Sequence, residues 1–171
     1  MSDSKSILLR PPTLKDGMAV FRLIENCPPL DINSSYCNLL QSSHFASTSV
    51  AAEMNGVLVG FISAYLLPDR PDTLFVWQVA VAEQARGVGL ASRMLAEILS
   101  RPQCTAANYL ETTITQDNQP SWALFKGLAK KMSSELQSSE WMDAQLHFDG
   151  QHDSESLVRI GPFKSLKINE E

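Results

Sequence analysis

The sequence predicts an α/β fold with a central mixed, largely antiparallel sheet of six or seven strands and helices on both faces. The first observation behind it is an apolar run at residues 74–81 that leads through a glycine pair into an amphipathic run at residues 90–100. The second is a pair of strand-like runs, residues 48–54 and 57–67, separated by Asn55-Gly56, which is a strong hairpin signal. The third is the alternation of predicted strands and helices along the chain.

The N-terminal part begins with a predicted strand at residues 6–10, which two prolines close. Thr13 is expected to cap a first helix, which ends at the prolines after Cys27. Residues 30–36 then turn into a second short helix that runs to about Ser43. The buried stripe of the first helix is expected to consist of Leu14, Met18, Phe21 and Ile24.

The C-terminal part alternates between strand and helix patterns. Residues 109–115 alternate in polarity, which predicts a strand with Glu111 on its polar face. Asn118 follows in a cap-like segment before a helix, and residues 141–148 and 157–160 are expected to pair as a final hairpin across Asp149-Gly150. The helix stripe is predicted to contain Trp122, Phe125 and Leu128 or Ala129.

Length and composition indicate one domain, residues 1–171, with a core at about 7–160 between polar tails. The net charge of −5 and the lack of a basic cluster argue against nucleic acid and favour a cationic substrate. A polar N-terminus and the absence of a long apolar run predict a cytoplasmic protein with no membrane segment. Three cysteines without paired spacing are expected to be thiols, and the three histidines lack zinc-ligand spacing, so no metal is expected.

The segment Gln84-Ala85-Arg86-Gly87-Val88-Gly89 lies between the predicted buried strand and the following helix. A helix start of this kind exposes unpaired N–H groups at the positive end of the helix dipole, and these groups bind anions such as a pyrophosphate. Neither the dinucleotide fingerprint nor the Walker loop matches the glycine spacing. The alternative is an ordinary strand-to-helix turn that uses glycine for tightness.

The spacing Gln84-x-x-Gly87-x-Gly89, with Arg86 inside it, resembles motif A of the Gcn5-related N-acetyltransferases (GNAT). A second segment, from Asn118 to Ala129, resembles the family's next helix. The resemblance implies the GNAT fold and acetyl-coenzyme A as co-substrate. The residues that it implies for coenzyme binding are Val79, Ala80, Val81, Gln84, Arg86, Gly87, Val88, Gly89, Asn118, Ser121 and Phe125.

Three further segments, residues 28–48, 75–81 and 110–118, resemble the L-2,4-diaminobutyric acid acetyltransferases. This resemblance implies acetylation of the 4-amino group of L-2,4-diaminobutyrate, by direct transfer, on the route to the compatible solute ectoine. By analogy with the family it also implies a homodimer. Two alternatives stay open: acetylation of another small amine or a protein amino group, and a non-catalytic acetyl-coenzyme A-binding domain.

Acetyl transfer to an amine requires a group that removes a proton, because an alkyl ammonium titrates near 10.4. Glu111 is the expected base, and the alternative is an exposed strand carboxylate. A backbone N–H near Val79 to Val81 is expected to polarise the thioester carbonyl. The family's thiol-protonating tyrosine corresponds here to Phe125, which cannot donate a proton. Tyr36 or a water is the expected substitute, with Tyr65 and Tyr109 as further alternatives.

The acceptor carries a carboxylate and two ammonium groups. Asp31, with Glu155 as a partner, is expected to hold the α-ammonium, while Asn33, Ser34 or a backbone N–H takes the carboxylate. Trp77 is expected to line the carbon chain and to offer its ring face to a cation. Alternatives are that Asp31 caps the second helix, that Trp77 is core and that Glu155 is a surface acid. The predicted acceptor residues are therefore Asp31, Asn33, Ser34, Tyr36, Trp77, Glu111 and Glu155.

Overall fold

The structure is a computed structural model that describes residues 6–163, and the chain forms two compact units. Unit 1 comprises residues 6–65 and 76–105, and unit 2 comprises residues 66–75 and 106–163. The predicted polar tails, residues 1–5 and 164–171, lie outside the described residues.

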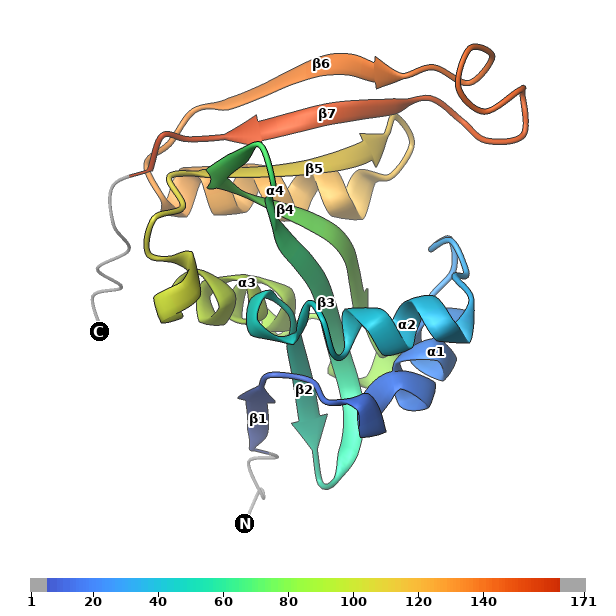
Figure 1. The fold of residues 1–171 in the computed structure, drawn as a ribbon, viewed down its shortest axis with the longest axis vertical. Helices are drawn as coiled ribbons and strands as arrows, with labels where there is room; N and C mark the ends of the chain where they lie inside the picture. Colours follow the sequence, from blue (N-terminus) through green and yellow to red (C-terminus); the bar gives the residue numbers. More distant parts are fainter. Residues whose placement is uncertain (1–5, 164–171) are drawn as a thin grey trace. The chain divides into compact units, whose positions relative to one another are not determined.

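The strands form one seven-stranded sheet in the order β1-β2-β3-β4-β5-β7-β6 (Figure 1), which confirms the predicted mixed, largely antiparallel sheet. Antiparallel ladders join β1 to β2, β2 to β3, β5 to β7 and β6 to β7. The connection from β4 to β5 passes through a helix, which lets two neighbouring strands run in the same direction. The strands are β1 Ile7–Arg10, β2 Val50–Met54, β3 Val57–Leu67, β4 Arg70–Val81, β5 Tyr109–Thr115, β6 Leu136–Met142 and β7 Glu155–Ile160.

Helices cover both faces of the sheet in unit 1. Phe61 of β3 lies in a buried cluster with Val20, Leu23 and Ile24 of α1. The neighbouring Gly60 faces the opposite side of the sheet, since successive residues of a strand alternate. A Cβ at Gly60 would lie 3.0 Å from the sulfur of Met94 in α3. The α-helices are α1 Gly17–Glu25, α2 Ser35–Gln41, α3 Leu90–Leu99 and α4 Gln119–Lys131, and the short 3-10 helices are η1 Leu14–Asp16, η2 Ala46–Thr48, η3 Glu83–Ala85 and η4 Pro102–Cys104.

The predicted stripe of the first helix is wrong at its N-terminal end. Leu14 and Met18 are exposed, Phe21 is only partly buried, and the buried positions of α1 are Gly17, Val20, Leu23 and Ile24. The reason is that residues 14–16 form the 3-10 helix η1, whose three residues per turn change the phase of the stripe. Gly17 is then needed for packing, since a Cβ at this position would lie 2.4 Å from Cδ2 of Leu39 in α2.

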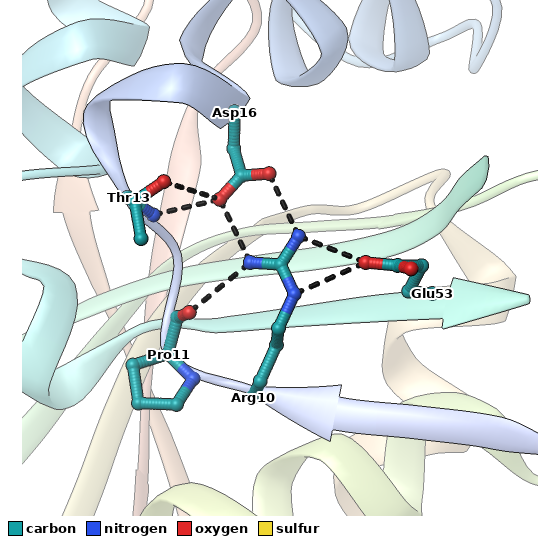
Figure 2. A network of polar contacts seen from close by, with 5 residues as sticks. All are labelled: Arg10, Pro11, Thr13, Asp16 and Glu53. Atoms are coloured by element: carbon teal, nitrogen blue, oxygen red, sulfur yellow. Dashed lines mark hydrogen bonds and ion pairs between the residues drawn. The ribbon is translucent and has the colours of Figure 1, made fainter. Parts of the chain in front are cut away.

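The predicted cap at Thr13 is confirmed and extends into a network around Arg10 (Figure 2). Thr13 and Asp16 form a capping box, in which the Thr13 N–H donates to Asp16 at 2.7 Å. Arg10 donates to both oxygens of Asp16 at 2.8 Å, to Glu53 at 3.1 and 3.0 Å, and to the carbonyl of Pro11 at 3.3 Å. The hydrogen bonds from Arg10 lower the pKa of Asp16, despite its burial. The network joins β1, η1 and β2.

The hairpin at Asn55-Gly56 is confirmed, because both residues have positive φ angles, 52° and 77°, as a type I′ turn requires. The final hairpin differs from the prediction: β6 begins at Leu136 and ends at Met142, and residues 143–154 form the connection. Asp143 ends the strand because its carboxylate accepts from the N–H groups of Gln145 and Leu146.

Candidate functional site

The glycine loop of unit 1 joins β4 to α3 and has an open backbone. Gly87 and Gly89 have φ angles of 78° and 72°, which residues other than glycine rarely adopt. A Cβ at either position would meet nothing within 4 Å, so the space beside both backbones is empty of protein. A ligand can therefore approach the main chain closely at both glycines.

The start of α3 supplies donors to that space. Gly89 is the N-cap residue of α3 and has no side chain, so the first N–H groups of the helix keep no intrahelical acceptor. Arg86 donates from Nε to the carbonyl of Val81 at 3.0 Å, which ties the loop back to the end of β4. Its two Nη groups have no partner among residues 6–163. The combination is a cationic site at a helix N-terminus, and it fits a phosphate group.

The predicted coenzyme residues of unit 2 lie at the start of α4. Asn118 is the N-cap residue, and its carbonyl oxygen accepts from the Ser121 N–H at 3.3 Å. Phe125 is buried with 2% exposure in the face of α4 that also buries Leu128 and Ala129. Its aromatic ring therefore acts in packing, and a coenzyme contact by Phe125 stays a prediction.

Glu111 is not the exposed carboxylate that the alternative interpretation expected. It is buried on β5 and bound by two arginines of unit 2: Arg70 donates at 2.6 and 3.0 Å to its two oxygens, and Arg159 also donates to it. Burial alone would raise the pKa of Glu111, but the hydrogen bonds from the two arginines outweigh burial and lower it. Arg159 also stacks on the ring of Tyr109 at 3.7 Å. Glu111 is thus a fixed, ionised carboxylate.

The predicted acceptor segment lies between α1 and α2 in unit 1. Ser34, not Asp31, caps α2, since the Ser34 hydroxyl accepts from the Cys37 N–H at 3.1 Å. The interpretation of Asp31 as a helix cap is therefore wrong. Asp31 is exposed. Asn33 donates to the side chain of Gln78 at 2.7 Å. One of the two amide N–H donors of Asn33 is thus already in use.

Trp77 is 40% exposed, so the alternative that places it in the core is wrong. Its ring meets those of Phe45 and Tyr65 edge to face, with centroids 6.4 and 6.1 Å apart. Phe45 and Tyr65 contact each other as well, at 5.6 Å. The three rings form an aromatic wall of unit 1 on which Trp77 is held from two sides.

The two remaining predicted acceptor residues, Tyr36 and Glu155, lie on different elements. Tyr36 lies in the first turn of α2 with an exposed ring. Glu155 begins β7 of unit 2 and is mostly covered, and its carboxylate lies 3.9 Å from His152 Nε2. No group of three or more metal-ligating side chains occurs among residues 6–163, and no helix within that range is long and apolar enough to cross a membrane.

Sequence reasoning missed three residues at these places: Arg70, Arg159 and Gln78. The only signal for the two arginines was a carboxylate predicted in a strand, which must find a cation if it is buried. Gln78 carried a weaker signal, as a polar residue within an apolar run.

Residues 18–129 match the family described as acetyltransferase (GNAT) family. An L-2,4-diaminobutyric acid acetyltransferase from Methylotuvimicrobium alcaliphilum is 58% identical over 161 residues, which cover 94% of this chain and 94% of the relative. The enzyme of the same name from Vibrio parahaemolyticus is 52% identical, over 92% of this chain and 87% of its own length.

A solved structure is also similar at the level of sequence. It is the diaminobutyrate acetyltransferase from Paenibacillus lautus, in complex with its substrate L-2,4-diaminobutyric acid and coenzyme A. It is 39% identical with a TM-score of 0.90, over 94% of this chain and 98% of that chain.

Proposed function

The chain belongs to the acetyltransferase (GNAT) family and, within it, to the L-2,4-diaminobutyric acid acetyltransferases, and on that premise we propose how it acts. It transfers the acetyl group of acetyl-coenzyme A to the 4-amino group of L-2,4-diaminobutyrate. The product is N4-acetyl-L-2,4-diaminobutyrate, on the route to ectoine. Transfer is direct, in a ternary complex: the amine nitrogen bonds to the thioester carbon, the carbon–sulfur bond breaks, and the thiolate leaves.

The observation that carries this proposal is the open loop before α3. Gly87 and Gly89 leave the backbone accessible, and the first N–H groups of α3 together with Arg86 offer donors to a pyrophosphate. Gln84 and Val88 complete the loop, and both are exposed. These local donors attract the polyanionic coenzyme despite the net charge of −5, because they act within one Debye length.

The backbone of Val79, Ala80 and Val81 at the end of β4 is proposed to polarise the thioester carbonyl. Preorganised N–H donors in such a place stabilise the oxyanion of acyl transfer.

Tyr36 is proposed to give a proton to the departing thiolate, and Tyr36→Phe tests this role. A thiol pKa near 8.5 lets the thiolate also leave without an acid, so we expect a loss of turnover of about tenfold at most.

Glu111 is proposed as the group that draws the proton from the acceptor ammonium. Its lowered pKa keeps it ionised at neutral pH, which is the state that a base requires. The same two arginines make it a weak base, so the proton would pass on to water. Glu111→Gln is expected to lower turnover with little change in acetyl-coenzyme A affinity, and wild-type turnover across the pH range would remove Glu111 from this role.

For the acceptor, we propose that Asp31 and Glu155 hold the α-ammonium and that Asn33, Ser34 or a backbone N–H takes the carboxylate. Trp77 is proposed to line the carbon chain, which its exposure and its aromatic neighbours support. Asp31→Asn is expected to raise KM for diaminobutyrate and to leave KM for acetyl-coenzyme A unchanged. An equal change of both would contradict a specific role of Asp31 in acceptor binding.

The activity itself is tested with the purified full chain, acetyl-coenzyme A and L-2,4-diaminobutyrate. Release of free thiol supports the proposal, and NMR of the product distinguishes the 4-amino from the 2-amino isomer. Faster release with a polyamine, another amino acid or a protein N-terminus would support a different acceptor. If no amine leads to release of free thiol and the protein still binds acetyl-coenzyme A, the chain is a non-catalytic acetyl-coenzyme A-binding domain.

The coenzyme loop has a matched control elsewhere in the chain. Gly89 and Gly56 have φ angles of 72° and 77°, and a Cβ at either would meet nothing within 4 Å. Gly89→Ala and Gly56→Ala therefore impose a similar backbone strain. We expect only Gly89→Ala to weaken acetyl-coenzyme A binding, by tenfold or more in calorimetry (about 1.4 kcal/mol). Equal affinity of the two variants would exclude the loop as the pyrophosphate site.

We further propose that both units belong to one acetyltransferase domain and that the protein is a cytoplasmic homodimer. The free state of Cys27, Cys37 and Cys104 supports a reducing compartment. β6, the last strand in the sheet order, is largely exposed and carries Trp141, which supports pairing of two chains there. Sedimentation of the purified chain as a monomer at micromolar concentration would contradict the dimer.

A further inference from the structure

The segment that carries Asp31 and Asn33 has no regular structure of its own. Residues 31–34 lie between the end of α1 and the start of α2 and contain neither helix nor strand. Main-chain groups outside helices and sheets lack ladder partners, so hydrogen bonds from side chains contribute strongly to their positions. The position of Asp31 therefore depends on whatever holds this segment.

Gln78 of β4 holds it with both ends of its amide. Its oxygen accepts from Nδ2 of Asn33 at 2.7 Å, and its nitrogen donates to the main-chain oxygen of Asp31 at 2.8 Å. A main-chain carbonyl can only accept, so the amide of Gln78 has one orientation that satisfies both contacts. These bonds connect residues that are 45 and 47 positions apart in the chain.

Gln78 is itself fixed on a rigid part of unit 1. Its main-chain N–H donates to the hydroxyl of Ser63 at 3.2 Å, and Ser63 is fully buried. The residue before it is Trp77, whose ring is held by Phe45 and Tyr65. The residue after it is Val79, the first of the three whose backbone is proposed to polarise the thioester. Gln78 thus connects the acceptor segment to the strand that carries the transfer step.

We propose that Gln78 is a positioning residue that sets the distance between Asp31 and the end of β4, and thereby selects the length of the diamine. The inference rests on the proposed function. Asp31 holds the α-ammonium, and the 4-amino group must reach the carbonyl carbon. A fixed segment admits the three carbon atoms that separate the two amino groups of diaminobutyrate, whereas a loose one also accepts a longer chain. Small displacements of a bound group have large effects on transfer rate.

The test compares Gln78→Met with Gln103→Met, a change of the same kind at an exposed position of η4. Methionine keeps the length of the side chain and removes both hydrogen bonds. We expect KM for diaminobutyrate to rise about tenfold in Gln78→Met while KM for acetyl-coenzyme A stays within about twofold. The preference for diaminobutyrate over L-ornithine, which has one more methylene, should fall about tenfold. Gln103→Met should match the wild type in all three.

A double-mutant cycle with Asn33→Ala checks that the effect passes through the contact. The cycle is measured in the order parameter of the Asp31 amide, because Asn33 is itself a proposed ligand of the acceptor carboxylate. If the effect passes through the contact, this order parameter falls about as far in the double variant as in Gln78→Met alone. A parallel measurement needs no activity: 15N relaxation of the amides of residues 31–33 should show order parameters that fall from about 0.85 toward 0.6 in Gln78→Met only.

The outcomes separate the two proposals. A wild-type protein that transfers no acetyl group to diaminobutyrate overturns the proposed function. Unchanged order parameters in Gln78→Met overturn the positioning role even in an inactive protein. An active Gln78→Met variant with unaltered selectivity, or one in which both KM values rise together, overturns the inference while the proposed function stands.

Discussion

Two networks of arginine and carboxylate groups in this chain have opposite stoichiometry. In unit 1, Arg10 lies between Asp16 and Glu53, so one cation serves two anions. In unit 2, Glu111 lies between Arg70 and Arg159, so one anion serves two cations. The first network leaves one formal negative charge and the second one formal positive charge.

The two networks also differ in how completely their donors are used. All five N–H groups of Arg10 have acceptors within the network and the Pro11 carbonyl (Figure 2). Arg70 uses only its two Nη groups, and its side chain is 48% exposed, whereas that of Glu111 is 4% exposed. All donors of Arg10 are therefore used within a structural network. The Glu111 network instead neutralises a deeply buried carboxylate, and some N–H donors of Arg70 are not used within it.

Glu111→Gln is expected to have the largest effect on stability. A glutamine removes the counter-ion that Arg70 and Arg159 share and weakens three charged hydrogen bonds, which we expect to cost about 3 kcal/mol. Urea unfolding monitored by circular dichroism measures the change. Glu25→Gln on the exposed face of α1 is the control and should change the free energy of unfolding by less than about 0.5 kcal/mol. Similar values for the two variants would mean that the ion pairs of Glu111 contribute nothing measurable to stability.

Arg10→Met should cost somewhat less, about 2 kcal/mol, because it removes charged hydrogen bonds from carboxylates that are closer to solvent. Asp16 keeps its contacts to Thr13 in this variant. The same urea experiment provides the measurement. A loss larger than that of Glu111→Gln would reverse the order that the two networks predict.

The pH dependence of stability identifies the contribution of Asp16. Hydrogen bonds from Arg10 lower the pKa of Asp16 below its usual 3.8. A group whose pKa is lowered by folding stabilises the protein above its unfolded pKa and loses that effect as the pH falls through the folded pKa. The difference in unfolding free energy between wild type and Asp16→Asn should therefore be constant above about pH 5 and shrink toward pH 2. A difference that is independent of pH would exclude an ionic contribution.

Arg70→Gln is expected to have the smallest effect, below about 1 kcal/mol, because its guanidinium is half exposed and Arg159 still neutralises Glu111. Thermal unfolding at two salt concentrations measures it, and high salt should reduce it further. If Arg70→Gln destabilised as strongly as Glu111→Gln, the two arginines would have to act as one inseparable unit.

Features that depend on neighbours in the chain were predictable. The hairpin at Asn55-Gly56, the cap at Thr13 and the glycine loop before α3 each need only a few consecutive residues, and all three stand as predicted. The stripe of α1 and the bounds of the last hairpin were predicted wrongly, because a 3-10 turn and the carboxylate of Asp143 changed the local geometry. Single turns of this kind leave little trace in hydrophobic periodicity.

The sequence by itself determined the alternation of strands and helices, the glycine loop before α3, and the resemblance to the diaminobutyrate acetyltransferases, because each depends on short runs of adjacent residues. The tertiary structure alone decided the partners of Glu111, which are 41 and 48 positions away, and those of Gln78, at 45 and 47 positions. The physical reason is that a buried or loop-bound polar group takes whichever partner the strands bring beside it. Strand pairing over such distances is a property of the folded chain.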